Sequence, residues 1–407
     1  MSRNSPFTVH RLQFTIGLPL LSGLLLVVSQ PPFSMSFLAF AALVPLFFAV
    51  EGLTPRAAFL RGFLAGLASY LGLIYWVTVA MNRYGGIPLP LSLLILLLLA
   101  LYLSCYTGVF AFLLRFVERR HGIPLYVTAP MAWIILEYLR GFLLTGFPWS
   151  LLAHSQHAFL PFIQIVSFTG SYFISFLIVA VNTVLYHLLS RKRIHWAYVA
   201  SVGLLMIGSL LYGFTVMARP ETPDHRVALV QGNVPQNLKW TAEAMSRSLE
   251  KYVAATETKG KGADLVVWPE TALPFIFDGD GPVGRAMADL AARTGADILF
   301  GAVSKGKDGG AYNSAFVTAK TGVVAGQYKK VHLVPFGEFT PLSSYIPFLE
   351  SMSVAGSGFL RGASHGPVPT SLGPAGILIC YEGMFPAETN ETVRSGAGFL
   401  VNITNDA

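Results

Sequence analysis

The sequence predicts a polytopic α-helical membrane domain over residues 1–217, followed by an α/β domain over residues 218–407. Hydrophobic residues make up 53% of the 407 residues and charged residues only 12%, whereas soluble proteins carry about 25% charged residues. Long apolar runs are confined to the first 217 residues. Beyond them, short apolar runs alternate with polar, Gly-rich turns and helical stretches, which is typical of a layered α/β domain.

Seven runs in the first domain are long enough to cross a bilayer, which takes about 20 residues each. They cover residues 11–29, 34–51, 57–80, 89–115, 124–145, 161–189 and 196–216. The first run follows Arg3 and Arg11, as a signal peptide would. No small-x-small cleavage pattern closes it, so we interpret it as a membrane anchor.

Basic residues beside these runs predict the orientation, because cytoplasmic loops carry the excess of Lys and Arg. With the N-terminus inside, only Arg83 and Arg140 fall outside, and ten basic residues fall inside: Arg3, Arg11, Arg56, Arg61, Arg115, Arg119, Arg120, Arg191, Lys192 and Arg193. An odd number of crossings then places the second domain outside. We expect a multi-pass protein of the bacterial inner membrane, with a cytoplasmic N-terminus and a periplasmic second domain. The net charge of +7 therefore reports topology, and no nucleic-acid partner is expected.

The second domain shows strands alternating with helices. Apolar runs predict strands within 226–234, 263–270, 296–304, 375–382 and 398–406, and apolar spacing predicts helices over about 241–258 and 283–294. Near-continuous apolar strands indicate that both faces of each sheet are covered. No Gly-rich phosphate loop is present, because "GDGPVG" at 279–284 lacks the spacing and the Lys-Ser/Thr pair.

Three motifs at strand ends each offer a reactive group. "VVWPETALP" carries Glu270, "YKKVHLVPFGEFTP" carries Lys330 and Glu338, and "ILICYEGMFP" carries Cys380. In α/β architectures, side chains from separate strands converge beyond the carboxyl ends of those strands. A carboxylate, an amine and a thiol meeting there would form a coherent catalytic set.

The chemistry of these groups predicts their roles. A thiol is a strong nucleophile once ionised, but its reference pKa of about 8.5 leaves little thiolate at neutral pH. A carboxylate can take the proton, and a fixed ammonium can stabilise the thiolate and a later oxyanion. Glu270 is therefore the expected base, Lys330 the cationic stabiliser and Cys380 the nucleophile. Strand alternation directs Lys329 to the opposite face from Lys330.

Simpler interpretations stand beside these roles. Cys380 taken alone could be a small buried hydrophobe, and His332 could form a Cys-His dyad with it. The second cysteine, Cys105, lies in an apolar run and is expected to pack as a free thiol. Glu137 and Arg140, three residues apart inside a span, could pair on one helix face or shape a lipid headgroup site.

The motifs resemble the nitrilase superfamily of carbon-nitrogen hydrolases, and the whole chain resembles its membrane-embedded branch, the apolipoprotein N-acyltransferase family. The matching segments are "EYLRGFLLTGFPW" (137–149), "QGNVPQNLKW" (231–240), "WPET" (268–271), "YKKVHLVPFGEFTP" (328–341), "CYE" (380–382) and "NITND" (402–406). The resemblance implies an αββα sandwich for the second domain. It implies a catalytic Glu270, Lys330 and Cys380, with supporting roles for Glu338, Tyr381, Glu382 and Trp240.

The implied reaction passes an acyl chain from a phospholipid, with phosphatidylethanolamine as the expected donor, to Cys380 as a thioester. The N-terminal α-amine of a diacylglyceryl-cysteine apolipoprotein then accepts it as an amide. No metal or cofactor is implied, and both substrates would approach from the lipid bilayer.

Three alternatives remain open. A membrane-tethered amidase or nitrilase would use the same triad and pass the acyl group to water, and a transporter or sensor would not need the triad. The third concerns the end of the chain: it stops at Ala407, just after "NITND", where the family continues. The resemblance therefore implies an α/β domain that is incomplete at its C-terminus, and an inactive fragment is the third alternative.

Overall fold

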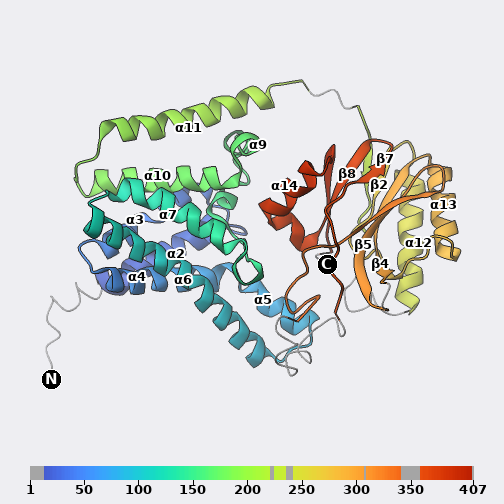
Figure 1. Cartoon of the computed structure of the whole chain (residues 1–407), viewed down its shortest axis with the longest axis horizontal. Coiled ribbons are helices and arrows are strands. Elements are labelled where there is room, and N and C mark those ends of the chain that lie inside the picture. The colour runs from blue at the N-terminus through green and yellow to red at the C-terminus, as the bar shows by residue number, and fades with distance from the viewer. Residues whose placement is uncertain (1–12, 221–223, 235–241, 307–308, 341–357, 406–407) are drawn as a thin grey trace. The chain divides into compact units, whose positions relative to one another are not determined.

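The computed structural model describes residues 13–220, 224–234, 242–306, 309–340 and 358–405. The chain divides into two compact units, Met1–Pro220 and Glu221–Ala407. The first unit is helical and the second contains both sheets (Figure 1).

The helical unit begins with short elements and then contains long helices. Its described elements are η1 (Gln13–Gly17), α2 (Leu18–Ser29), η2 (Ser36–Phe40), α3 (Val44–Val50), α4 (Pro55–Leu73), α5 (Trp76–Val79), η3 (Ala80–Tyr84), α6 (Leu89–His121), α7 (Leu125–Arg140), η4 (Leu143–Thr145), η5 (Leu152–Gln156), α8 (Leu160–Ile163), α9 (Val166–Thr169), α10 (Ser171–Leu189) and α11 (Trp196–Met217).

Close backbone approach holds α4 against α6. A Cβ atom at Gly62 of α4 would lie 2.3 Å from the backbone oxygen of Thr107 of α6, so only glycine fits there. Small residues allow this approach where lipid provides no hydrophobic drive between helices.

Local signals set the start of α4. Pro55 occupies its first turn, and the Thr54 hydroxyl accepts a hydrogen bond from Ala57 N.

Fewer helices reach full spanning length than the seven expected crossings. Among the described residues, three are long and apolar enough: Leu89–His121, Ser171–Leu189 and Trp196–Met217. Pro55–Leu73 and Trp76–Tyr84, bent by 45° at their break, would together make a fourth. The continuous helix expected over 161–189 is broken, because Gly170 takes a φ of +76° between α9 and α10. The seven crossings therefore stay a prediction.

The second unit contains two sheets. Its described elements are β1 (Val227–Leu229), α12 (Ala242–Lys259), β2 (Leu265–Val267), β3 (Leu273–Ile276), α13 (Pro282–Thr294), β4 (Asp297–Lys305), β5 (Ala311–Thr318), β6 (Val324–Lys329), β7 (Val368–Thr370), β8 (Gly373–Ile379), η7 (Cys380–Met384), α14 (Pro386–Arg394) and β9 (Phe399–Ile403). The five predicted strands and two predicted helices are confirmed, and the sequence did not single out β3, β5, β6, β7 or α14.

The larger sheet has the strand order β1-β2-β4-β5-β6, with β3 paired to β4. Strands β1, β2 and β4 are parallel, whereas β5 and β6 are antiparallel to their neighbours. The smaller sheet has the order β7-β8-β9, with β8 and β9 parallel. The carboxyl ends of β2 and β4 therefore share one edge, as those of β8 and β9 do.

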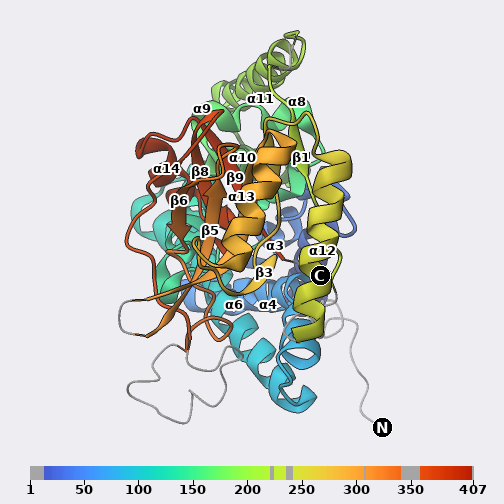
Figure 2. The same cartoon turned by 90° about the vertical axis from the view of Figure 1, so that its right-hand side faces the viewer.

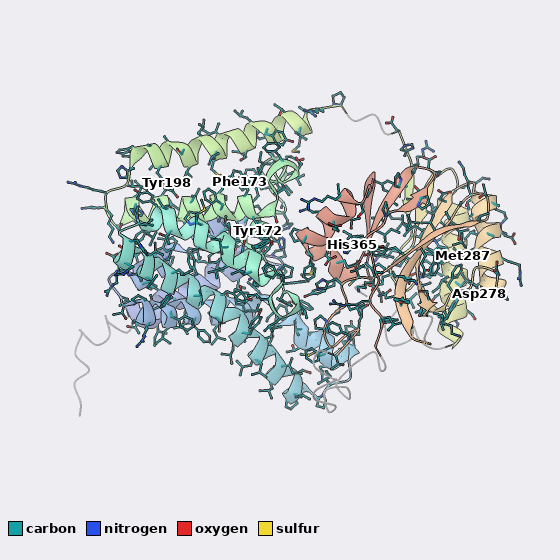
Figure 3. The ribbon with its side chains drawn as sticks, viewed as in Figure 1. Tyr172, Phe173, Tyr198, Asp278, Met287 and His365 are labelled. Carbon is teal, nitrogen blue, oxygen red and sulfur yellow. The ribbon has the colours of Figure 1, made fainter. Side chains whose placement is uncertain are left out.

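The layers of this unit run helix, sheet, sheet, helix. On one face of the larger sheet, α12 and α13 lie side by side (Figure 2), with Tyr252 and Met287 packed in one core with Trp268 and Phe300; Figure 3 labels Met287. The opposite face packs against the smaller sheet in a second core, whose buried residues are Leu265, Val267, Leu299, Ala315, Val317, Tyr328, Val368, Ala375, Ile377, Ile379 and Ile403. Helix α14 contacts β8. The unit is an αββα sandwich.

Candidate active site

A buried cluster of charged side chains in the α/β unit surrounds Lys330. This residue follows β6 directly, and its side chain is only 1% exposed. Its Nζ lies 3.4 Å from Oε1 of Glu270 and 2.9 Å from Oε2 of Glu338. One ammonium thus lies between two buried carboxylates contributed by separate segments.

These neighbours determine the protonation state of Lys330. Burial by itself would lower the pKa of Lys330, but Glu338, Glu270 and Cys380 more than offset that effect and hold the pKa above its ordinary value. Lys330 is therefore an ammonium at neutral pH.

Glu270 is held by contacts from three segments. Its Oε1 accepts a hydrogen bond from Asn313 Nδ2 at 2.7 Å, as well as the contact from Lys330, and its Oε2 accepts from Asn405 N at 3.2 Å. The turn that carries Glu270 packs tightly on β4, because a Cβ at Gly301 would lie 2.7 Å from Glu270 Cα. The segment after β9 therefore reaches the carboxylate through Asn405.

Asn313 was not singled out from the sequence. It lies on β5, is 2% exposed, and donates to Glu270 Oε1 at 2.7 Å and to Glu338 Oε1 at 2.8 Å. One amide therefore bridges the two carboxylates that flank Lys330. The available signal was a single Asn in the apolar run "AYNSAFVT", which would not be buried there without partners.

Cys380 begins the turn that follows β8. The strand ends at Ile379, and Cys380 opens η7 with a φ of +54°, which is uncommon for a residue other than glycine. Strained conformations of this kind concentrate at functional sites, where the surrounding structure maintains them. The side chain is half-buried, and neither Cys380 nor the exposed Cys105 forms a disulfide, as expected.

Glu382 joins the Cys380 turn to the Lys330 segment. This carboxylate is fully buried, and its Oε2 accepts from Ile379 N at 2.8 Å. Its Oε1 accepts from Val331 N at 2.7 Å, His332 N at 3.0 Å and the Tyr328 hydroxyl at 2.9 Å. Burial raises the pKa of Glu382, although the hydrogen bonds oppose the shift. Both oxygens hold neighbouring groups in place.

The remaining predicted positions take varied places. Tyr381 contacts the rings of His332 and Phe385, and burial raises the pKa of its hydroxyl. Lys329 does not join the carboxylates, since its Nζ lies 4.3 Å from the ring centre of Tyr312. Trp240 lies outside the described residues.

His332 contacts Glu388 through Nδ1 at 3.1 Å. Within the described ranges, no three His, Cys, Asp or Glu side chains are grouped as metal ligands.

In the helical unit, Glu137 and Arg140 are both buried but form no salt bridge with each other. Glu137 Oε1 accepts from Leu152 N at 2.7 Å, and Arg140 donates to the Tyr70 hydroxyl. Pairing on one helix face, one of the two interpretations of the sequence, is therefore not observed, because Glu137 contacts Leu152 and Arg140 contacts Tyr70 of α4. Both line a cavity of about 20 Å³, together with Tyr70 and Trp133.

Comparisons with known proteins find related sequences for both units. Residues 22–184 match the apolipoprotein N-acyltransferase N-terminal domain, and residues 226–407 match the carbon-nitrogen hydrolase domain. The chain is 40% identical over 401 residues to an apolipoprotein N-acyltransferase of Geobacter metallireducens, covering 95% of this chain and 76% of that protein. It is 34% identical to one of Chromobacterium violaceum, covering 86% of this chain and 68% of that protein.

A solved carbon-nitrogen hydrolase from Helicobacter pylori G27 is also similar to part of this chain. It is 19% identical, with a TM-score of 0.32 over 44% of this chain and 59% of that chain. The two domain matches together cover both units, and the match to the G. metallireducens protein runs through them. The chain belongs to the apolipoprotein N-acyltransferase family.

Proposed function

We propose that this chain transfers an acyl chain from a phospholipid to the N-terminal α-amine of a diacylglyceryl-cysteine apolipoprotein, through a thioester on Cys380. The observation that carries the proposal is the buried Lys330 held between Glu270 and Glu338, on a segment that Glu382 joins to the turn of Cys380. Family membership supports lipoprotein N-acylation in general.

In the first step, Glu270 takes the thiol proton and the Cys380 sulfur attacks the ester carbonyl carbon of the phospholipid. The resulting oxyanion is stabilised by the Lys330 ammonium. The carbon–oxygen bond then breaks, and the proton passes from Glu270 to the departing lysophospholipid alkoxide. The acyl chain remains on sulfur as a thioester.

In the second step, the neutral α-amine of the apolipoprotein attacks the thioester carbonyl carbon. Glu270 accepts a proton from the amine, and Lys330 again lies opposite the developing oxyanion. The carbon–sulfur bond breaks, an amide forms, and the proton returns to the Cys380 thiolate. Through both steps, Glu338 holds the Lys330 ammonium in position, and Asn313 holds the carboxylates of Glu270 and Glu338.

The helical unit suits lipid-borne substrates. Its apolar helices support a membrane location, and the bilayer would deliver both a phospholipid donor and a lipid-anchored acceptor by lateral diffusion. We propose the bacterial inner membrane, a cytoplasmic N-terminus and a periplasmic α/β unit, on the excess of basic residues in the predicted cytoplasmic loops. Phosphatidylethanolamine is the donor we propose to test first.

The test is to incubate the purified chain with acyl-labelled phosphatidylethanolamine and to analyse the Cys380 peptide by mass spectrometry. We expect acyl mass on that peptide, absent in Cys380→Ser, and its discharge by a diacylglyceryl-cysteine peptide. Cys105→Ser is the matched control and should acylate like the parent. Discharge by water at the same rate, with free fatty acid as product, would instead assign the chain to the membrane-tethered hydrolases.

A further inference from the structure

Glu388 of α14 lies between two imidazoles that come from different segments. Its Oε1 lies 3.1 Å from Nδ1 of His332, which follows β6, and its Oε2 lies 2.7 Å from Nε2 of His365, which precedes β7. The three side chains are 13–17% exposed. Figure 3 labels His365 beside α14. No step of the reaction above uses this cluster.

The two histidines differ in the contacts of their ring nitrogens. His332 Nε2 is buried and has no hydrogen-bond partner among the described residues. His332 therefore contacts the cluster through Nδ1 alone, which lies 3.1 Å from Glu388 Oε1. His365 has an oxygen near each ring nitrogen. Glu388 Oε2 lies 2.7 Å from Nε2, in a close contact that lacks hydrogen-bond geometry, and the Tyr328 hydroxyl lies 3.5 Å from Nδ1.

Two routes connect Glu388 to the turn that carries Cys380. The first passes through His332, whose backbone N–H donates to Glu382 Oε1 at 3.0 Å. The second passes through His365 to Tyr328, whose hydroxyl donates to the same oxygen at 2.9 Å. Glu382 in turn accepts from Ile379 N, next to Cys380. Both routes end on the carboxylate that holds the nucleophile turn.

The His365 segment also touches Lys330 directly. Gly362 N donates to the backbone oxygen of Lys330 at 2.8 Å, and Phe359 N donates to that of Glu338 at 2.8 Å. The carboxylate of Glu388 therefore contacts the two segments that flank Lys330, one through each oxygen.

We propose that Glu388 is a positioning residue, which aligns Lys330 with Cys380 by clamping His332 and His365. The proposal rests on the proposed function of the site but concerns a residue that does not touch substrate. The other titratable groups facing the cluster are Arg361, Tyr328, Tyr381 and Glu382.

The charge of the clamp persists at neutral pH. Burial alone would raise the pKa of Glu388, but His332, His365 and Arg361 lower it below its ordinary value. Replacing Glu388 by Gln keeps an oxygen that can accept from His332 Nδ1 and removes the charge that faces His365. Replacing it by Ala removes both contacts.

The experiment measures how fast iodoacetamide alkylates Cys380 in the full chain between pH 6 and 10, by peptide mass spectrometry. Cys105, in the same preparation, is the internal control because it is exposed on α6. We expect Glu388→Ala to slow Cys380 alkylation about tenfold at pH 7 and to shift the pH midpoint upward, because a displaced Lys330 stabilises the thiolate less. Glu388→Gln should be intermediate, and Cys105 should not change.

Glu391→Ala is the matched control variant, because Glu391 is an exposed glutamate one turn further along α14. If Glu388→Ala and Glu391→Ala both retain the parent's pH midpoint, the proposal is overturned. If Glu388→Ala does not fold, His332→Phe and His365→Phe carry the test: a rise of the midpoint in both supports the clamp, and parent-like midpoints refute it.

Alkylation needs no lipid, so the outcome is separable from that of the proposed function. A parent chain that never acylates from phospholipid, yet shows the midpoint shift in Glu388→Ala, would refute the acyl transfer and retain the clamp. A parent chain that acylates from phospholipid, with no midpoint shift in Glu388→Ala, would support the acyl transfer and refute the clamp.

Discussion

The side-chain amide of Asn313 donates a hydrogen bond of 2.7 Å to Oε1 of Glu270, and its second hydrogen bonds to Glu338 at 2.8 Å. An amide therefore separates two buried carboxylates that share a single lysine. The Asn313 amide and the Lys330 ammonium together hold Glu270 and Glu338 close together, although the two carboxylates would repel each other if they were alone.

Removing the bridge should weaken the site. We expect Asn313→Ala to lower the stability of the α/β unit by about 1–3 kcal/mol, because two buried carboxylates each lose a donor. Asn313→Asp should be worse, since it places a third carboxylate within hydrogen-bond distance of Glu270 and Glu338 and so adds repulsion between like charges. Thermal unfolding of the purified chain measures both, with the exposed Asn390→Ala as control. An Asn313→Asp variant more stable than Asn313→Ala would contradict this account.

The two adjacent lysines should differ sharply. We expect Lys330→Met to abolish acylation of Cys380 and to cost about 3–5 kcal/mol of stability, because Glu270 and Glu338 remain buried without their cation. Lys329→Met should lose only the contact with the Tyr312 ring, about 0.5–1 kcal/mol. Labelled phospholipid and thermal unfolding provide the two measurements. Equal losses from both substitutions would show that Lys330 is not the site lysine.

The raised pKa of Lys330 predicts an alkaline limit. A lysine whose pKa is higher in the folded state stabilises fully below its unfolded value, about 10.4, and loses that contribution as pH rises through the folded value. The difference in melting temperature between the parent and Lys330→Met should therefore stay constant from pH 7 to about pH 10 and shrink above it. A difference that already shrinks near pH 8 would argue against a charged, paired Lys330.

Glu382→Gln tests the junction between the two catalytic segments. One amide oxygen can replace Oε1, but the amide nitrogen would then face Ile379 N, so two donors meet where one bond of 2.8 Å existed. We expect a loss of about 1–3 kcal/mol and slower alkylation of Cys380, with Glu391→Gln as control.

The same variant carries a pH signature. Because burial raises the pKa of Glu382, the folded parent binds more protons than the unfolded chain above the ordinary glutamate value, so its stability falls as pH rises through that window. Glu382→Gln should lack this fall. Parallel stability curves for parent and variant between pH 4 and 7 would overturn the assignment.

Glu137 should be a structural residue of the helical unit. We expect Glu137→Ala to cost about 1–3 kcal/mol, because Leu152 N loses its acceptor. Glu137→Gln keeps an acceptor and should cost less. Thermal unfolding in detergent gives the ranking, and Ile135→Ala, 54% exposed on the same helix, is the control. A Glu137→Gln variant less stable than Glu137→Ala would refute this role.

Sequence by itself determined the class of the protein and the reactive groups. Composition and the distribution of basic residues indicated membrane helices, and short apolar strands indicated the α/β unit. The motif that places Lys330 eight residues before Glu338 identified a pair that the structure holds 2.9 Å apart, because both lie on one short segment. Such local relationships are visible in a linear chain.

Tertiary structure alone decided which distant residues support that pair. Asn313 is a single amide on β5, and Glu388 and His365 belong to no motif, so their spacing carried no signal. They matter because two packed sheets bring β5, the segment after β6 and α14 to one place. The broken helices at 161–189 follow from Gly170 taking a positive φ, a backbone choice that hydropathy does not register. Asn313 and His365 are needed because the carboxylates that they contact are largely buried, and a buried carboxylate must take its partners from the protein itself.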